Sequence, residues 1–236
     1  MKYKTFGLTH PGKMRTRNED AYLLDDIRRI YAVADGLGGL PEGDLASSMA
    51  IQQLNELLSA STSREPDYLK VFNEISRAVW REGVRLQAEI GIGTTLTLLV
   101  LRERSCTVCH VGDCAVFLFR KDKWEQLTTD HTMAEELRAQ HPGEQVIVPE
   151  HFSHTLTRCI GQPGELQVEI RKHTLKAGDR LLICSDGITK TISEEELYYI
   201  SKVSSSPQEL IEKCINLAND RGGPDNSTGI AIFAAE

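Results

Sequence analysis

The chain has 236 residues, of which 40% are apolar and 26% charged, and its formal net charge is −7. This composition excludes a disordered or collagen-like chain, and the length suits one or two globular domains. No apolar run approaches the roughly 18 residues of a membrane-spanning helix. The acidic balance argues against nucleic acid or an anionic membrane as a main partner. The first residues form no apolar leader, so we expect a cytoplasmic location and reduced cysteines.

Short runs rich in Val, Ile, Leu, Phe and Thr predict a set of β-strands. They are expected at residues 21–24, 30–34, 94–101, 106–111, 115–120, 166–173, 180–184 and 229–233. The three runs between residues 94 and 120 are separated by only three or four residues. Because parallel strands need long crossovers, these neighbours should pair antiparallel.

Apolar residues at helical spacing predict four helices, at residues 45–58, 66–90, 194–201 and 207–219. Asp67 suits the N-cap of the second helix. Because strand groups and helix pairs are segregated along the chain, the pattern favours an α+β fold of antiparallel sheets with flanking helices. No repeat or linker divides the chain, so we expect one domain over residues 1–236.

Acidic residues stand at the ends of five of these strands, each beside glycine or asparagine. They occur in Asn18-Glu19-Asp20, Asp35-Gly36, Gly112-Asp113, Asp186-Gly187 and Asp225-Asn226. One Asp-Gly pair is ordinary turn chemistry, but repeated pairs without hairpin spacing indicate a shared rim of carboxylates. Such carboxylates repel one another unless they are protonated or neutralised by cations, and oxygen ligands favour Mg²⁺ or Mn²⁺. Two such ions activate water and clamp a phosphoryl group.

Seven motifs follow one another along almost the whole chain. They are Arg15-x-x-Asn18-Glu19-Asp20, Ala34-Asp35-Gly36-x-Gly38-Gly39-x-x-x-Gly43, Gly93-Thr94-Thr95, Val111-Gly112-Asp113, Leu127-Thr128-x-Asp130-His131, Ser185-Asp186-Gly187 and Gly223-x-Asp225-Asn226. In this order they resemble the PPM family of metal-dependent protein Ser/Thr phosphatases, also called protein phosphatase 2C. The length resembles that of bacterial members consisting of the catalytic domain alone.

The resemblance implies an α-β-β-α sandwich, with two antiparallel sheets flanked by pairs of helices. It also implies a cofactor of two Mn²⁺ or Mg²⁺ ions, with a third, weaker ion in several members. The implied metal ligands are Glu19, Asp20, Asp35, Gly36 through its carbonyl, Asp113, Asp186 and Asp225. Asp35 would bridge the two metals, and Asp113 would hold the third together with Asp186. Arg15 matches the arginine that binds phosphate, and the implied catalytic residues are Arg15, Asp35 and Asp186.

The implied reaction is direct hydrolysis of phosphoserine or phosphothreonine in a protein. A hydroxide held between the two metals attacks phosphorus, and no phosphoenzyme forms. The implied partners are a phosphorylated protein substrate and the bacterial Ser/Thr kinase that the enzyme opposes. The oligomeric state is left open by the sequence, and a monomer is the default expectation.

Two departures from the family pattern stand out. Leu37 replaces a histidine that some relatives carry as a proposed general acid. Residues 131–157 match the family's mobile flap beside the active site, but residues 145–149 do not have the usual helical pattern.

Three alternatives stay open. A haloacid-dehalogenase-like phosphatase needs a second aspartate two residues after its nucleophile, where this chain has Leu37. A catalytically weak PPM domain that only binds phosphoproteins would be expected to lack Asp35, Asp186 or Asp225, and all three are present. A partner-switching phosphatase would share the chemistry and differ in its substrate.

Other residues have simpler interpretations. Cys106-x-x-Cys109-His110 has the spacing of a haem attachment site, but on a strand Cys106 and His110 face one side and Cys109 the other. We therefore expect the cysteines to be buried apolar residues. His131 and Arg158 are expected to have structural roles in or near the flap, and Trp80 and Trp124 to pack in the core.

Overall fold

A computed structural model describes residues 1–38, 40, 42–63, 65–86, 91–144 and 146–235. Gly39 of the second motif and the end of the expected helix at residues 87–90 lie outside the described residues. The strands are β1 (Lys2–His10), β2 (Asp20–Asp25), β3 (Ile30–Asp35), β4 (Leu96–Leu101), β5 (Ser105–Val111), β6 (Ala115–Arg120), β7 (Lys123–Gln126), β8 (Glu169–Thr174), β9 (Arg180–Cys184) and β10 (Ser227–Ala235). The helices are α1 (Gly43–Ala60), α2 (Tyr68–Arg85), α3 (Met133–Gln140), the 3₁₀ helix η1 (Glu150–His154), α4 (Asp186–Thr189), α5 (Glu194–Val203) and α6 (Pro207–Asp220).

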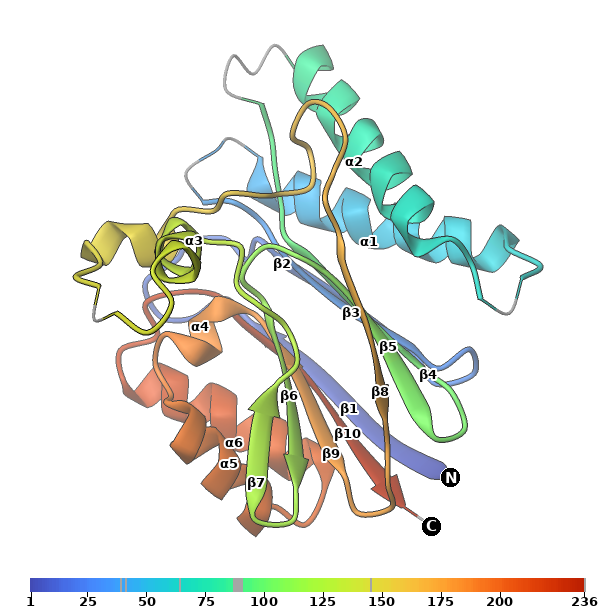
Figure 1. Cartoon of the computed structure of the whole chain (residues 1–236), viewed down its shortest axis with the longest axis vertical. Helices are drawn as coiled ribbons and strands as arrows, with labels where there is room; N and C mark the ends of the chain where they lie inside the picture. Colours follow the sequence, from blue (N-terminus) through green and yellow to red (C-terminus); the bar gives the residue numbers. More distant parts are fainter. Residues whose placement is uncertain (39, 41, 64, 87–90, 145, 236) are drawn as a thin grey trace.

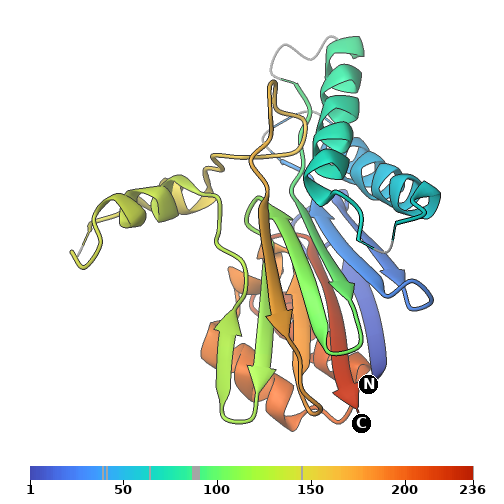
Figure 2. The ribbon, with the colours of Figure 1, turned by 45° about the vertical axis from the view of Figure 1, so that its right-hand side comes forward.

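The strands form two five-stranded antiparallel sheets. One has the order β1-β10-β9-β6-β7 and the other β2-β3-β4-β5-β8. The first and last strands pair along their whole length, from Lys2 opposite Ala235 to His10 opposite Ser227, so the two ends of the chain lie side by side (Figures 1 and 2). The α+β sandwich expected from the sequence is confirmed.

Alternating burial on the strands produces three apolar layers. Val33, Leu99, Val116 and Ile183 are among the residues that pack between the two sheets. Helices α1 and α2 cover the outer face of the β2-β3-β4-β5-β8 sheet, and α5 and α6 cover the outer face of the other sheet (Figure 1). Strand β4 is buried at every position, and its one polar residue, Thr97, pairs with His110 on β5.

Side-chain caps fix the starts of α2, α5 and α6. Asp67 caps α2 by accepting a hydrogen bond from the Lys70 N–H, as expected. Ser193 and Glu196 form a reciprocal capping box at the start of α5. Ser206 caps α6, whose first residue is Pro207, a position where the missing N–H is not needed.

Five of the described elements, β1, β7, α3, η1 and α4, were not expected from the sequence. Strand β1 was missed because its polar and apolar residues do not concentrate into an apolar run, and it lies half-exposed at a sheet edge. The edge strand β7 has only four residues, and α4 only four. Helix α3 lies in the flap, which projects from the sandwich in Figure 2, and its only buried residue is Ala134.

The cysteine prediction is largely confirmed, whereas one tryptophan prediction is wrong. Cys106 faces the layer between the sheets and Cys109 the layer under α1 and α2, and five of the six cysteines are buried. Trp124 is half-buried and stacks on Tyr198. Trp80 is 42% exposed on α2, because it falls outside the apolar stripe of that helix. Among the described residues, the helices are too short or too polar to cross a membrane.

A buried ion pair ties the two sheets together at the end remote from the acidic strand ends. Asp179, 2% exposed, accepts hydrogen bonds from Arg120 Nε at 2.8 Å and Nη2 at 2.7 Å, and from the Lys176 N–H at 2.7 Å. Arg120 lies on β6, and its Nη2 also donates to the Thr174 carbonyl at the end of β8 in the other sheet, at 2.8 Å.

We expect Asp179→Ala to lower the free energy of unfolding by about 3 kcal/mol, because it leaves Arg120 without its buried partner. The measurement is urea denaturation followed by circular dichroism. Asp122→Ala is the matched control: it breaks a surface pair with Lys202, in which the two side chains are 85% and 56% exposed, and should leave the midpoint near that of wild type. Equal losses in the two variants would contradict this account.

Candidate metal centre

The acidic motifs meet because the antiparallel order brings their strand ends to one end of the sandwich. Asp20 begins β2 and is the register partner of Asp35, which ends β3. Directly opposed residues have Cβ atoms about 5 Å apart and point to the same face. In the other sheet, Asp186 follows the end of β9 and Asp225 precedes the start of β10, its antiparallel neighbour. Asp113 follows β5 in the same sheet as Asp35.

Asp20 joins the two sheets at this point. Its Oδ2 accepts hydrogen bonds from the Ser185 hydroxyl at 2.8 Å and the Thr228 hydroxyl at 2.6 Å. Both hydroxyls come from the opposite sheet, at the end of β9 and the start of β10. Ser185 Oγ also accepts from the Thr228 N–H at 3.0 Å, which fixes the orientation of the hydroxyl. The carboxylate of Asp20 is therefore oriented by contacts across the sandwich.

The backbone around Asp35 is fixed by Thr94 and Thr95. The Asp35 N–H donates to Thr95 Oγ1 at 2.9 Å, and the Asp35 carbonyl accepts from the Thr95 N–H at 2.8 Å and the Thr94 hydroxyl at 2.8 Å. The Gly36 N–H donates to the Glu19 carbonyl at 3.0 Å. A Cβ on Gly36 would lie 2.3 Å from the Gly43 carbonyl oxygen, so only glycine fits where this loop meets the start of α1.

Positive side chains contact the acids from the solvent side. Arg15 contacts both carboxylate oxygens of Asp225, with Nε 3.0 Å from Oδ1 and Nη2 3.0 Å from Oδ2. Lys190 Nζ contacts Asp186 Oδ2 and lies 3.4 Å from Asp225 Oδ2. A Cβ on Gly38 would lie 3.0 Å from Arg15 Nη1 and 3.2 Å from Glu19 Oε2, so glycine allows both side chains to approach.

These groups line a cavity of about 600 Å³. Its walls include Arg15, Glu19, Asp35, Gly36, Asp113, Asp186 and Asp225, and Asp20 lies buried beneath them. The flap contributes His154, Thr155 and Leu156, and Leu37 lines the same cavity. The structure thus brings together all eight residues singled out from the sequence.

Crowding of buried carboxylates raises their pKa values. Burial, followed by the charges of Asp20 and Asp186, raises the pKa of Asp35 well above its usual range. Burial raises the pKa of Asp20 to about 7 against the opposing effect of the Thr228 and Ser185 hydroxyls. Burial and the charge of Asp186 raise the pKa of Asp113 to about 7.

The donor set fits divalent cations. Within the described part of the chain, the buried oxygens Asp20 Oδ1 and Asp186 Oδ1 have no hydrogen-bond partner. Orphaned buried carboxylate oxygens are costly unless a cation or proton satisfies them. The acidic residues and the Gly36 carbonyl offer only oxygen donors, which suit Mg²⁺ and Mn²⁺ better than softer metals. The observed carboxylates therefore favour the metals expected from the sequence.

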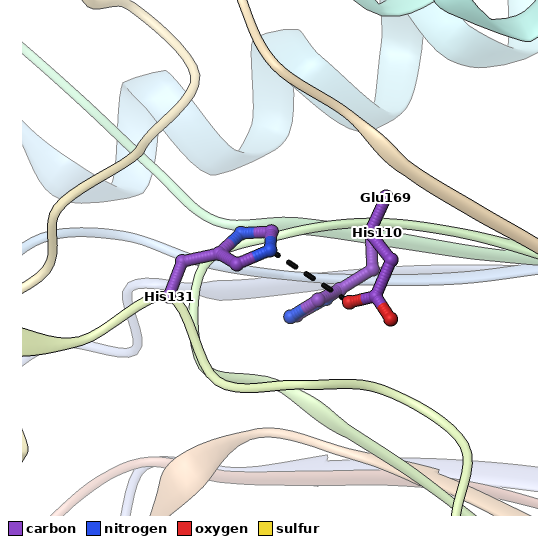
Figure 3. A group of neighbouring side chains, drawn as sticks. All are labelled: His110, His131 and Glu169. Atoms are coloured by element: carbon purple, nitrogen blue, oxygen red, sulfur yellow. Dashed lines mark ion pairs between the residues drawn. The ribbon is translucent and has the colours of Figure 1, made fainter. Parts of the chain in front are cut away.

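A second group of possible metal ligands lies at the base of the flap. It consists of His110, His131 and Glu169, whose ligand atoms all lie within 4.8 Å of one another (Figure 3). His110 and Glu169 are register partners on β5 and β8 and share a face. His110 Nδ1 lies 2.8 Å from Thr97 Oγ1, and its Nε2 is buried without a partner in the described structure.

The surroundings of this group favour a polar network over a metal ion. His131 Nδ1 accepts from the Gly112 N–H at 3.2 Å, which places the proton of a neutral ring on Nε2, where a metal would need a lone pair. That Nε2 lies 3.7 Å from Glu169 Oε2 and 3.4 Å from Arg158 Nη1. A guanidinium at this distance would repel a second cation. In this tautomer Nε2–H and the Arg158 guanidinium are both donors, so their contact is not a hydrogen bond. The Thr157 N–H donates to the His131 carbonyl at 2.8 Å, which joins the two ends of the flap.

Comparisons with known proteins agree with this geometry. The model of the family described as "Protein phosphatase 2C" matches residues 12–219. The protein phosphatase PhpP of Streptococcus pneumoniae is 32% identical over 235 residues, covering 94% of this chain and 93% of that protein. The Streptococcus agalactiae serine/threonine phosphatase structure has a TM-score of 0.90 at 25% identity, covering 99% of this chain and 100% of that one.

A further solved structure includes metal ions. The catalytic domain of the serine/threonine protein phosphatase PstP, in complex with two manganese ions, has a TM-score of 0.84 at 27% identity and covers 99% of both chains. The chain therefore belongs to the protein phosphatase 2C family. The enzyme class expected from the sequence, a metal-dependent protein Ser/Thr phosphatase, is confirmed.

The sequence assigned no role to several residues that shape the site. Thr95 and Ser185 stand in the family motifs, but only the structure shows that Ser185 bonds the Asp20 carboxylate and that Thr95 bonds the Asp35 backbone. Thr228, the second hydroxyl partner of Asp20, carries no distinctive pattern. Lys190 had a recognisable signal, because it follows Asp186 by four residues in a helical turn, the spacing of an ion pair.

The pKa of Asp20 predicts how the stability of the metal-free protein changes with pH. Because the carboxyl is protonated more readily when folded, the stability it contributes is present at acidic pH and is lost as pH rises from about 4 to about 7. Chelator-treated protein should therefore lose stability relative to Asp20→Asn between pH 5 and pH 7.5, by at least about 1.4 kcal/mol, the equivalent of one pKa unit. Urea denaturation of both proteins at the two pH values measures the difference, and parallel pH profiles would refute the assignment.

Proposed function

We propose that residues 1–236 form a single catalytic domain that hydrolyses phosphoserine and phosphothreonine in protein substrates at the acid-lined cavity. The observation that carries this proposal is the meeting of five aspartates from two sheets, with buried Asp20 and Asp186 oxygens that have no partner in the described structure. Asp35 would hold both ions of a dinuclear Mn²⁺ or Mg²⁺ centre. Its other ligands would be Asp186, Asp225, the Gly36 carbonyl, Glu19 and Asp20, directly or through water.

The bound ions would supply Lewis acidity that lowers the pKa of water and positive charge that stabilises the phosphoryl oxygens. The chain itself contributes the positions of the ligands and the electrostatic environment of the cavity. Two hydroxyls orient the Asp20 carboxylate, and the two threonines fix the backbone of Asp35, so these parts of the site are in place before substrate arrives. Asp113 and Asp186 line the cavity together and would hold a third, weaker ion.

Arg15 would bind the phosphate of the substrate. Its side chain lines the cavity and is 43% exposed even though it pairs with Asp225. A planar guanidinium that fits two carboxylate oxygens also fits two phosphate oxygens. Leu37 cannot donate a proton, so the side chain at this position does not protonate the leaving hydroxyl group.

The proposal extends to the substrates, partners and location of the enzyme. We propose that the enzyme acts as a monomer in the cytoplasm and opposes a bacterial Ser/Thr kinase that phosphorylates its substrate. The relative PhpP is named as a protein phosphatase, which supports a phosphoprotein substrate here. An intact set of carboxylates gives no support to a domain that only binds phosphoproteins.

Hydrolysis of p-nitrophenyl phosphate and of a phosphothreonine peptide tests the proposal. Both reactions should require Mn²⁺ and stop with EDTA, and Asp35→Asn should lose at least about 10²-fold in kcat, a loss typical for removal of one strong electrostatic stabiliser. Circular dichroism checks that the variant is folded. Turnover of Asp35→Asn at the wild-type rate, or undiminished activity of wild type in EDTA, would rule out this centre.

Arg15→Ala should raise KM for p-nitrophenyl phosphate by about tenfold or more, because one charge-assisted phosphate contact is lost. Arg17→Ala is the matched control, since Arg17 lies two residues away, is 68% exposed and lies 3.9 Å from Asp44. Steady-state kinetics at saturating Mn²⁺ measure both variants. The phosphate-binding role of Arg15 would be wrong if the two variants had the same KM.

A further inference from the structure

Lys190 holds a position among the metal-site carboxylates that the proposed function does not explain. It directly follows α4, whose first residue is Asp186, so one helical turn brings its side chain back beside that carboxylate. Nζ contacts Asp186 Oδ2 and lies 3.4 Å from Asp225 Oδ2. Asp186 begins α4 and Asp225 lies in the loop before β10, and the ammonium group connects the two carboxylates.

The environment of Lys190 keeps its side chain charged. Burial lowers its pKa, but the carboxylates of Asp186, Asp225 and Asp35 together raise that pKa above its usual value. The side chain is 30% exposed and lines the cavity along with the acids. Arg15 pairs with Asp225, and among the described residues Lys190 is the cationic side chain that forms an ion pair with Asp186.

We propose that Lys190 is an internal cation that competes with a divalent metal ion for Asp186 and Asp225. This inference rests on the proposed function, in which the same two aspartates hold a metal. An ammonium ion in contact with both carboxylates lies where an ion bound by both would have to lie. Metal binding therefore requires Nζ to leave, and the free energy of that ion pair is subtracted from the affinity for metal.

The contact of Lys190 with the two carboxylates stabilises the metal-free fold and lowers the affinity for metal. In the metal-free protein, Lys190 offsets the repulsion between acids and so stabilises the fold. Toward the metal, the same charge acts as a tethered competitor, present at high effective concentration. A lysine suits this role, because its flexible four-carbon stem lets a compact charge move away without disturbing the helix.

Isothermal titration of chelator-treated protein with Mn²⁺ tests the proposal. Lys190→Gln should bind Mn²⁺ at least about tenfold more tightly than wild type, the equivalent of 1.4 kcal/mol. Its metal-free form should melt about 3 °C lower, the shift expected for about 1 kcal/mol in a chain of this size. Lys190→Arg keeps the charge and should remain close to wild type. Lys202→Gln, which removes a surface ion pair with Asp122, is the matched control.

The outcomes separate this inference from the proposed function. If wild type and Lys190→Gln bind Mn²⁺ with the same Kd, Lys190 does not compete, and the metal centre stands. Weaker binding by Lys190→Gln would show that Lys190 supports the bound metal, which overturns the inference. If neither protein binds Mn²⁺, the metal centre itself is wrong.

A measurement on the wild-type protein removes any dependence on how a variant folds. Amine-reactive labelling followed by peptide mass spectrometry reports the accessibility of each lysine. Labelling of Lys190 should increase several-fold on addition of Mn²⁺, because Nζ is released from Asp186 and Asp225, whereas labelling of Lys202 should not change. Unchanged labelling of Lys190 under saturating Mn²⁺ would overturn the proposal.

Discussion

The repulsion among carboxylates at one end of the sandwich is the constraint on which the rest of the site depends. Asp20 and Asp35 are register partners, so the pairing of β2 with β3 forces their carboxyl groups together. The other sheet adds Asp186 and Asp225 at the same end. Apolar packing between the two sheets keeps these carboxylates close together. Their charges must therefore be neutralised by protons, by cationic side chains or by metal ions.

The surrounding residues offset part of this repulsion and fix where the carboxylates lie. Hydroxyls from the opposite sheet accommodate one oxygen of Asp20 and leave its Oδ1 buried without a partner in the described structure. Glycine at position 36 lets the loop after β3 approach the start of α1. Arg15 and Lys190 balance charge at the mouth of the cavity. The same carboxylates that destabilise the metal-free protein thus account for its dependence on metal.

Much of this could be predicted from the sequence, because the informative patterns are local. Strand β6 and strand β9 were expected with the residue bounds that the structure gives them, since each is a continuous apolar run between turn residues. The candidate site was found from acids beside glycine at strand ends and from the order of the family motifs. What the sequence could not provide depends on tertiary contacts: the edge strand β1, the hydroxyl partners of Asp20, and the backbone hydrogen bonds of His131 at the base of the flap.

Crystals soaked in Mn²⁺ and measured at the manganese absorption edge test the central claim most directly. Anomalous scattering locates the ions without any assumption about activity. The account predicts two strong peaks in the cavity, within ligand distance of Asp35, with Asp186 and Asp225 beside the first. Strong peaks only at His110, His131 and Glu169, or none in the cavity, would contradict it.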